Sequence, residues 1–245
     1  MIKYFCKFLG IKSKRDFLLL LFLWKHPIFV SKMLRSSQSQ NSQEVFVAYQ
    51  LKLWNSFREG GYFIEFGAAD GIYLSNTYLL ESVFHWRGLL VEPARVWRRG
   101  LLANRTCIKD FRCVYEKSGE SINFTETDQP GLSTISAFED SDRHSRSREK
   151  GINYLVKTVT LFELLREHKC PKVIDYLSID TEGSEFEILK KFPFNKYKFR
   201  IITVEHNFTE SREKIHDLLT KNGYTQVLKR VSYNDDWYLQ SENIL

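Results

Sequence analysis

A buried strand that runs into a glycine turn is the feature that most limits how this chain can fold. Residues Tyr62 to Phe66 are almost all apolar and fit a strand that is covered on both faces. Gly67 and Gly71 then allow a tight turn and close approach of the backbone to a ligand, and a helical pattern follows. This order predicts an α/β domain, although a glycine pair alone favours an ordinary strand-to-helix turn over a ligand site.

Acidic side chains in this turn restrict the kind of ligand it suits. A phosphate-binding loop presents bare N–H groups to a pyrophosphate, and Asp70 would repel that anion. The dinucleotide fingerprint is also broken, because Ala69 stands at its second glycine and no third glycine follows at the expected spacing. A cationic ligand fits Glu65 and Asp70 better. S-adenosylmethionine is such a ligand, since it has no phosphate and carries sulfonium and ammonium groups.

Three further apolar runs end in an acidic residue. They lead into Glu92, Asp180 and Glu205. Because the carboxyl ends of parallel strands share one edge of a sheet, these acids and Glu65 should converge on the crevice where ligands bind. Glu92 lies about one βαβ step beyond the glycine turn, where an acid typically accepts hydrogen bonds from both ribose hydroxyls. Taken alone, Glu92 fits a solvated strand terminus equally well.

Five motifs, in matching order and spacing, resemble the FkbM-type S-adenosylmethionine-dependent methyltransferases: FIEFGAADGIYLSNTYLLE, GLLVEP, VKTVTLFELL, YLSIDTEGSEFEIL and ITVEHN. The resemblance covers roughly residue 62 to the C-terminus, a domain-sized span. It implies an α/β fold, a Rossmann-like class I methyltransferase sandwich whose mostly parallel sheet carries helices on both faces, after an N-terminal helical extension. Family members methylate hydroxyl groups, often on sugars or glycosylated natural products.

Carried over position by position, the resemblance implies a cofactor site and a place for the reaction. The residues that would hold the cofactor are Glu65, Gly67, Asp70, Gly71, Ser75, Asn76 and Glu92. Asp180 would sit beside the transferring methyl group. One departure is small: the family more often has Asp where Phe162 or Glu163 stands, at a predicted helix start, which concerns the helix cap and not catalysis.

Methyl transfer requires the acceptor oxygen to be held opposite the leaving sulfur, so positioning supplies much of the acceleration. A sugar hydroxyl is a weak nucleophile, and Asp180 or His206 at neighbouring strand ends could take its proton. A lone histidine is more often structural, which disfavours His206. Asp180, Glu205 and His206 would also suit a divalent metal ion.

Composition and charge divide the chain into two parts. The 245 residues, 43% of them hydrophobic, suffice for one sizeable core. The polar, low-complexity segment 36–43 has the composition of a linker. We therefore expect a basic and apolar helical extension with its linker over residues 1–43, and an FkbM-like methyltransferase domain over residues 44–245.

The net charge of +6 comes from the extension. Residues 1–40 hold eight Lys and Arg residues against Asp16 alone, a surplus of seven that leaves residues 41–245 at −1. The catalytic domain is therefore close to neutral. It lacks an interleaved basic and aromatic motif, which argues against a nucleic-acid partner.

The extension contains an apolar run from Phe17 to Trp24, which is too short to span a bilayer. It also lacks a small-residue cleavage site, so a signal peptide is a poor fit. Residues 1–35 fit either peripheral contact with an anionic membrane or a helical arm packed on the domain or a partner subunit. The four cysteines show no C-x-x-C spacing and suit reduced thiols, so we expect a cytoplasmic protein, with membrane contact as the open alternative.

The remaining elements are predicted more coarsely from periodicity and turn signals. We expect helices over 44–57, up to 104 and over 210–222, a strand around 112–115, a β-rich stretch over 122–138, a strand and helix over 156–168, and paired strands over 224–239 that turn at Asn234 and Asp235. The charged segment 139–151 is predicted to be a solvated loop, with a mobile loop at the substrate mouth as the alternative.

Three functional classes fit these observations. The leading one is an S-adenosylmethionine-dependent O-methyltransferase acting on a hydroxyl of a sugar, glycolipid or related molecule. A nicotinamide-dependent oxidoreductase is disfavoured by Asp70 and the missing glycines. The third class is a cofactor-binding module without turnover in a glycan-assembly complex, and the intact acids Glu65, Asp70, Glu92 and Asp180 argue against it.

Overall fold

A mixed seven-stranded sheet forms the centre of the molecule in the computed structural model, which describes residues 11, 13–52, 60–127, 129–140 and 145–241. Its strand order is β10-β11-β9-β8-β1-β2-β3. The parallel strands are β1 (Tyr62–Phe66), β2 (Arg87–Val91), β3 (Ile108–Asp110), β8 (Val173–Ile179) and β9 (Lys198–Glu205). Strand β11 (Asp235–Gln240) runs antiparallel between β9 and β10 (Tyr224–Val227). The prediction of a mostly parallel sheet is confirmed.

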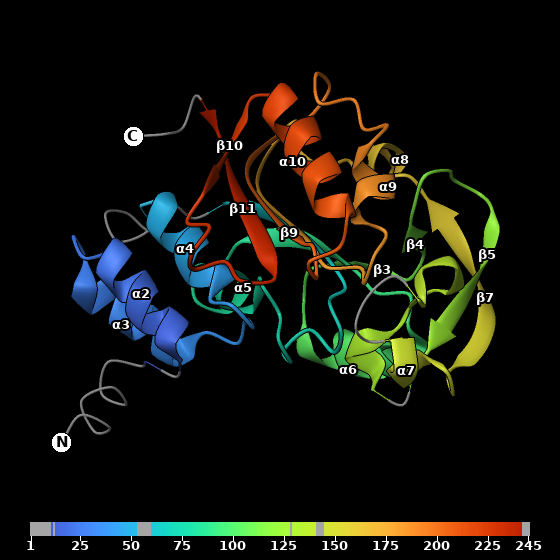
Figure 1. The fold of residues 1–245 in the computed structure, drawn as a ribbon. Coiled ribbons are helices and arrows are strands. Elements are labelled where there is room, and N and C mark those ends of the chain that lie inside the picture. Colours follow the sequence, from blue (N-terminus) through green and yellow to red (C-terminus); the bar gives the residue numbers. More distant parts are fainter. Residues whose placement is uncertain (1–10, 12, 53–59, 128, 141–144, 242–245) are drawn as a thin grey trace.

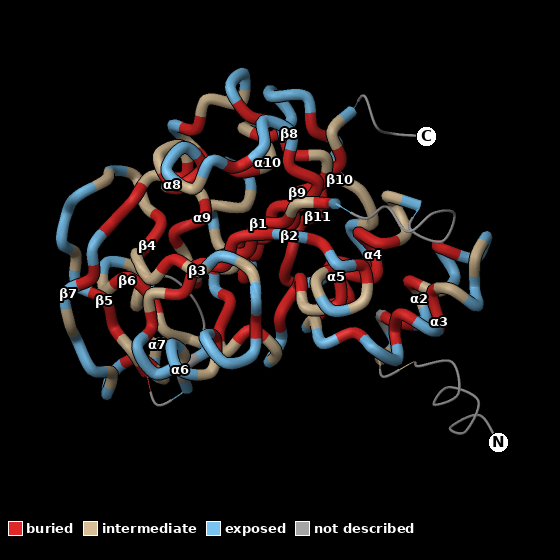
Figure 2. The backbone as a smooth tube through the Cα atoms, turned by 180° about the vertical axis from the view of Figure 1, so that it is seen from behind, coloured by how far each residue is buried: buried red, intermediate tan, exposed pale blue. Residues whose placement is uncertain are grey.

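Helices cover both faces of this sheet, as predicted (Figure 1). One face packs against α8 (Leu161–Glu167), α9 (Glu185–Leu189) and α10 (Ser211–Lys221). The other packs against α4 (Gln43–Gln50), α5 (Tyr78–Ser82) and α6 (Arg95–Asn104). Helices α2 (Lys14–Phe22) and α3 (Pro27–Ser36) join the same core from outside α4. Side chains alternate along β1, so Ile64 and Phe66 join the first core and Phe63 joins the second. Figure 2 shows that the central strands consist mostly of buried residues.

A smaller sheet is inserted between β3 and α8, at the end of the molecule away from α2 and α3 (Figures 1 and 2). Its order is β4-β7-β5-β6, formed by β4 (Cys113–Val114), β5 (Ser121–Glu126), β6 (Thr134–Ile135) and β7 (Ile152–Val159). The short helices η1 (Pro130–Leu132), η2 (Ser136–Phe138) and α7 (Ser145–Arg148) connect its strands. These elements confirm the predicted β-rich stretch.

Helix α6 is capped by a residue distant in the sequence, and helix α8 by the residue that precedes it. Helix α6 has no side-chain cap of its own, and Glu126 of β5 accepts hydrogen bonds from the N–H groups of Arg95 (2.8 Å) and Val96 (3.2 Å). Helix α8 is capped by Thr160, whose hydroxyl accepts from the N–H of Glu163 (3.2 Å). The helix cap of α8 is therefore present although Phe162 and Glu163 depart from the family pattern.

The predicted paired strands at the end of the domain are β10 and β11, with one difference in the turn. Asp235 is the first residue of β11, so the connection spans residues 228–234 and includes Asn234 but not Asp235. Helix α10 ends before Gly223, whose φ of 83° is left-handed, as predicted. The helix predicted over 44–57 appears as α4, and residues 53–59 lie outside the described part of the chain.

The segment 36–43 is not a solvated linker at most of its positions. Asn41 and Gln43 are buried, and their side-chain amides donate to Asn234 (2.8 Å) and Asp235 at the start of β11. Glu44 accepts a hydrogen bond from the N–H of Gln38 (2.8 Å). The linker prediction is wrong at Asn41 and Gln43, because the distant residues Asn234 and Asp235 accept hydrogen bonds from their buried side-chain amides. The division of the chain at residue 43 stays a prediction.

Helices α2 and α3 pack on α4, on the side away from the sheet (Figure 1). Leu19, Val30 and Leu34 are fully or almost fully buried in the same core as Phe63 and Trp237. The described part of residues 1–35 is therefore a helical arm packed on the domain, one of the two predicted arrangements. Among the helices of the described residues, none has the length and hydropathy that crossing a membrane requires.

Candidate functional site

The site lies where β1, β2 and β8 end side by side. The N–H of Gly67 donates to Val91 (3.1 Å), and the N–H of Asp180 donates to Phe66 (3.3 Å). Gly67 has a φ of 76°, and a Cβ atom there would lie 1.9 Å from the carbonyl oxygen of Asp180. No side chain larger than hydrogen fits at this position, so the glycine is needed for the close approach of the ends of β1 and β8. Its close approach to a ligand stays a prediction.

A partly open pocket with a cavity volume of about 90 Å³ lies against this edge. Apolar side chains of the second sheet and of α6 meet acidic and hydroxyl groups in its wall. The lining residues are Phe66, Gly67, Ala69, Tyr73, Leu74, Asn76, Val91, Glu92, Pro93, Trp97, Cys113, Val114, Phe124, Gly131, Ser133, Ile135, Asp180, Thr181, Glu182 and Ser184. The pocket thus has the mixed apolar and polar lining of a small-molecule site.

Glu92 joins the glycine turn to the start of α6. One carboxylate oxygen accepts from the N–H of Ala69 (2.8 Å), and the other accepts from the N–H of Ala94 (2.8 Å). Burial raises the pKa of Glu92 to about 7, against the lowering effect of these two hydrogen bonds. Its oxygens retain lone pairs that could accept further donors from a ligand in the pocket.

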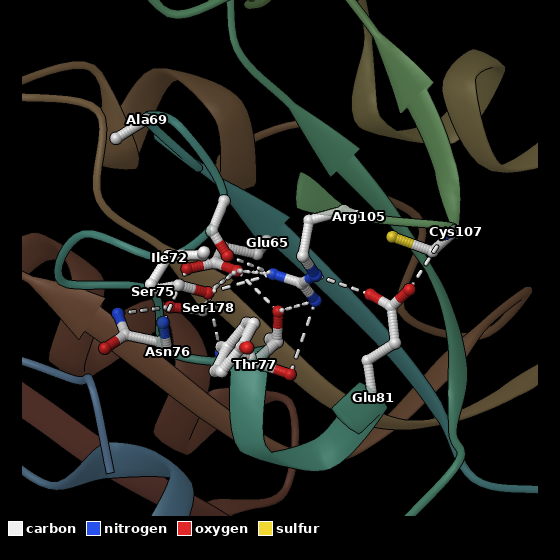
Figure 3. A network of polar contacts seen from close by, with 12 residues as sticks. Glu65, Ala69, Ile72, Ser75, Asn76, Thr77, Glu81, Arg105, Cys107 and Ser178 are labelled. Atoms are coloured by element: carbon white, nitrogen blue, oxygen red, sulfur yellow. Dashed lines mark hydrogen bonds and ion pairs between the residues drawn. The ribbon is translucent and has the colours of Figure 1, made fainter. Parts of the chain in front are cut away.

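Glu65 does not line the pocket and lies in a buried polar network (Figure 3). Its carboxylate accepts from the N–H of Asn76 (2.6 Å) and the hydroxyls of Ser75 (3.0 Å) and Thr77 (2.5 Å). Asn76 alone of these reaches the pocket, and its amide donates to Ser178 (3.0 Å). Glu65 and Ser75 therefore shape the loop 71–77, and their contact with a cofactor stays a prediction.

Arg105 completes this network, although the sequence analysis did not single it out. The residue is 3% exposed and donates to the carbonyl of Gly71 (2.9 Å), the hydroxyl of Ser75 (3.1 Å) and the hydroxyl of Thr77 (3.0 Å). It also forms an ion pair with Glu81 (2.5 Å) (Figure 3). One guanidinium thus holds both ends of the loop, which requires its several donors in a fixed plane.

Asp70 closes the glycine turn. Its carboxylate accepts from the N–H groups of Ile72 (2.9 Å) and Tyr73 (2.7 Å), and it is not among the residues that line the pocket. A Cβ atom at Gly71 would lie 2.5 Å from Cγ of Arg105, so this glycine is needed for packing. Attraction of a cationic ligand by Asp70 stays a prediction.

Three acidic side chains meet at the edge of the pocket. Asp180, Glu182 and Glu205 each place a carboxylate oxygen within 4.8 Å of the others. One oxygen of Glu205 accepts from Asn234 (3.1 Å), while the other is buried with no hydrogen-bond donor. Burial raises the pKa of Asp180 to about 7 and that of Glu205 well above its usual value. A shared proton or a cation would satisfy this cluster.

The structure does not bring His206 into that cluster. Its Nδ1 accepts from the N–H of Phe208 (3.0 Å), and its Nε2 lies 3.6 Å from a carboxylate oxygen of Asp236. Burial lowers the pKa of this imidazole, and His206 does not line the pocket. Among the described residues, Glu182 takes the place that the sequence analysis gave to His206 in a metal-binding set.

Arg148 and Glu182 form a buried ion pair at the pocket wall. Arg148 donates to Glu182 (2.9 Å) and to the carbonyl of Leu132 (2.8 Å), and it is 2% exposed. The prediction of a solvated loop over 139–151 is therefore wrong at this residue, and residues 141–144 lie outside the described part. No local signal pairs Arg148 with Glu182, since 34 residues separate them.

The sequence matches a family model described as the methyltransferase FkbM domain over residues 65–225. A search of curated proteins found no match. The solved structure of methyltransferase FkbM from Methylobacillus flagellatus KT is similar at 12% identity with a TM-score of 0.47, covering 87% of this chain and 58% of that chain. The chain therefore spans less than two thirds of that relative's length.

Two other solved methyltransferase structures are similar over much of the chain. The N-terminal domain of human METTL16 in complex with SAH aligns at 13% identity with a TM-score of 0.37, covering 80% of this chain and 68% of that chain. Precorrin-6y C5,15-methyltransferase from Geobacter metallireducens GS-15 aligns at 12% identity with a TM-score of 0.36, covering 79% of this chain and 85% of that chain.

Because the family model covers more than half of the sequence, the chain belongs to the FkbM family of S-adenosylmethionine-dependent methyltransferases and has the class I methyltransferase fold.

Proposed function

We propose that this chain is an O-methyltransferase that moves the methyl group of S-adenosylmethionine to a hydroxyl of a sugar, glycolipid or related hydroxylated molecule. The observation that carries the proposal is the joint presence of Glu92 and Asp180 in one pocket whose floor is the Gly67 turn. Family membership supports the cofactor and argues against the nicotinamide-dependent oxidoreductase.

The residues of the pocket fit the cofactor chemically. Glu92 offers free lone pairs for the two ribose hydroxyls, and Val114, Phe124 and Ile135 provide an apolar wall for a flat base. Asp180 supplies the carboxylate that favours the sulfonium. When bound, the cofactor would provide an electrophilic methyl group.

The polar part of the pocket supports a hydroxylated acceptor. Ser133, Thr181, Glu182 and Ser184 line it together with Asp180. Hydroxyl and carboxylate groups can both accept hydrogen bonds from a sugar hydroxyl, and the serines and threonine can also donate to its oxygens. An apolar acceptor would leave these groups without partners, which costs binding free energy.

Asp180 is the general base that we propose for this reaction. It would accept the hydroxyl proton as the carbon–oxygen bond forms, and a pKa of about 7 suits a base that works near neutral pH. A divalent ion held by Asp180, Glu182 and Glu205 is the alternative means of activating the hydroxyl. Full activity after exhaustive chelation would rule out that alternative.

Calorimetric titration tests the cofactor assignment. We expect micromolar binding of S-adenosylmethionine and S-adenosylhomocysteine, and no binding of NAD. Glu92→Gln should weaken binding at least about tenfold by removing a charged acceptor. Asp180→Asn should retain binding of the product S-adenosylhomocysteine, which lacks the sulfonium charge. Binding of NAD alone would restore the oxidoreductase reading.

An acceptor screen with methyl-labelled cofactor tests the reaction. The label should enter hydroxylated acceptors and survive mild alkali, because ethers resist the hydrolysis that cleaves methyl esters. Asp180→Asn should lower kcat by about 10²–10⁴-fold. Alkali-labile product would point to a carboxyl acceptor. Tight cofactor binding without turnover across the screen would favour the non-catalytic module.

A further inference from the structure

The outer side of the helical arm α2–α3 carries large apolar side chains that the fold leaves uncovered. Phe17, Leu21, Phe22, Trp24 and Ile28 are between 47% and 85% exposed. We call these five residues the arm patch. Such a concentration of exposed apolar side chains within twelve consecutive positions is uncommon on a soluble surface and marks an interaction site.

The arm is held firmly in place, so the exposure of the patch is a property of the packed fold. Leu19 and Leu34 on its inner side are buried in the core. Ser13 and Asp16 form a capping box at the start of α2. The carboxylate of Asp16 also accepts from the hydroxyl of Ser42 (2.8 Å), which ties α2 to the segment before α4.

Basic side chains accompany the arm patch. Lys14, Lys25 and Lys32 are exposed on α2, on the connection and on α3. Lys14 precedes Phe17 by three residues, and Lys32 follows Ile28 by four, so each lies beside an apolar residue on its helix. The acid in this part of the chain, Asp16, is buried. The exposed side of the arm therefore combines apolar rings with positive charge.

We infer that the arm patch docks on an anionic membrane surface. Aromatic and aliphatic side chains would enter the boundary between headgroups and acyl chains, and lysines would contact the acidic headgroups. A second copy of the chain is a poorer occupant, because a two-fold interface would bring the same lysines face to face. The inference is independent of the proposed function.

The position of the arm is compatible with catalysis on a membrane. Helices α2 and α3 lie at one end of the molecule, and the small sheet that contributes Phe124 and Ile135 to the pocket lies at the other (Figures 1 and 2). Docking through the arm patch would therefore leave the pocket wall unobstructed. Cofactor affinity should be the same with and without vesicles.

Co-sedimentation of the full chain with vesicles tests the inference. Vesicles of phosphatidylcholine with phosphatidylglycerol should retain the protein, and vesicles of phosphatidylcholine alone should retain at least about tenfold less. The triple variant Leu21→Ser/Trp24→Ser/Ile28→Ser should lose at least about tenfold in partitioning, since each change removes buried apolar area. Lys25→Glu/Lys32→Glu should lose a similar factor and reduce the salt dependence.

A matched control uses exposed apolar residues elsewhere. Ile152 and Leu155 on β7 are 69% and 61% exposed, and Ile152→Ser/Leu155→Ser should bind vesicles like the wild type. Unchanged Tm and cofactor affinity would show that each variant is folded. Equal partitioning of the triple variant and wild type overturns the inference. So does equal binding to neutral vesicles, or a lipid-free dimer that the triple variant abolishes.

Discussion

Arg105 shows how one residue can organise a ligand-binding loop without lining the pocket. Its guanidinium bonds Gly71, Ser75 and Thr77, which encloses the stretch that presents Asn76 to the pocket. The nearby carboxylate of Glu65, 4.0 Å away, shares two of these partners. We regard Arg105 as a positioning residue because its contacts are with the loop.

Arg105→Lys should weaken cofactor binding by about tenfold or more. A lysine keeps the charge but cannot make the planar set of hydrogen bonds, so the loop loses its fixed shape. Calorimetry with S-adenosylhomocysteine measures the loss. The control is Arg99→Lys, at an exposed residue of the preceding helix α6, which should bind like the wild type. If Arg105→Lys bound S-adenosylhomocysteine as tightly as Arg99→Lys and the wild type, the positioning role would be contradicted.

Cofactor binding should depend on pH through Glu92. Its pKa is raised to about 7, so the carboxylate that accepts ribose hydroxyls is present above pH 7 and is lost below it. We expect affinity for S-adenosylhomocysteine to be about tenfold lower at pH 6 than at pH 8. Glu92→Gln should bind weakly at all three of pH 6, 7 and 8. A wild-type affinity that rises toward pH 6 would refute this assignment.

At the scale of elements, the site depends on how closely β1 and β8 approach each other at their ends. Gly67 and Gly119 have nearly the same left-handed φ, 76° and 79°. A Cβ atom at Gly67 meets the backbone of Asp180, whereas one at Gly119 meets nothing within 4 Å. Substituting alanine at both positions therefore separates the free-energy cost of a left-handed backbone, which both share, from the cost of a steric clash, which only Gly67 has.

Gly119→Ala should lower the free energy of unfolding by about 1–2 kcal/mol, the cost of a left-handed alanine, and leave cofactor binding intact. Gly67→Ala should cost more than this and abolish binding, because the ends of β1 and β8 must move apart. Thermal unfolding and calorimetry on both variants measure the difference. Similar losses would mean that strain alone, and not the close approach, matters.

At the scale of the whole molecule, acids are concentrated in the interior. Burial raises the pKa of Glu44, Glu92 and Asp180 to about 7, and that of Asp235 to about 6. Each of these groups binds its proton more tightly when folded. The stability that they give is therefore full below their unfolded pKa values and declines as the pH rises through the folded ones.

The ligand-free protein should therefore have a lower Tm at pH 8 than at pH 5. We expect a fall of at least about 3 °C, the shift that 1 kcal/mol produces in a domain of this size. Glu81 and Asp110 act in the opposite sense, because hydrogen bonds and basic partners lower their pKa to about 2. Their stabilisation is already complete by pH 5. Thermal scans across this range measure the trend, and a rising Tm would contradict it.

The order of strands and helices followed from local patterns in the sequence. Apolar runs marked β1, β2, β8 and β9, although β3 was not predicted. Gly67, Gly71 and Gly223 marked turns, because such signals depend on neighbouring residues. The convergence of Glu92 and Asp180 was also predictable, since parallel topology places the ends of the strands at one edge.

The tertiary structure alone decided where polar side chains point. Glu65 turned to the loop that Arg105 holds, and Glu182 rather than His206 joined Asp180, through partners many residues away. Hydrophobic patterns also did not predict that Asn41 and Gln43 are buried, or which apolar residues of the arm stay exposed. The physical reason is that hydrophobic periodicity reports which face of an element is buried, whereas each buried polar group is satisfied by whichever distant donor or acceptor the completed fold brings to it.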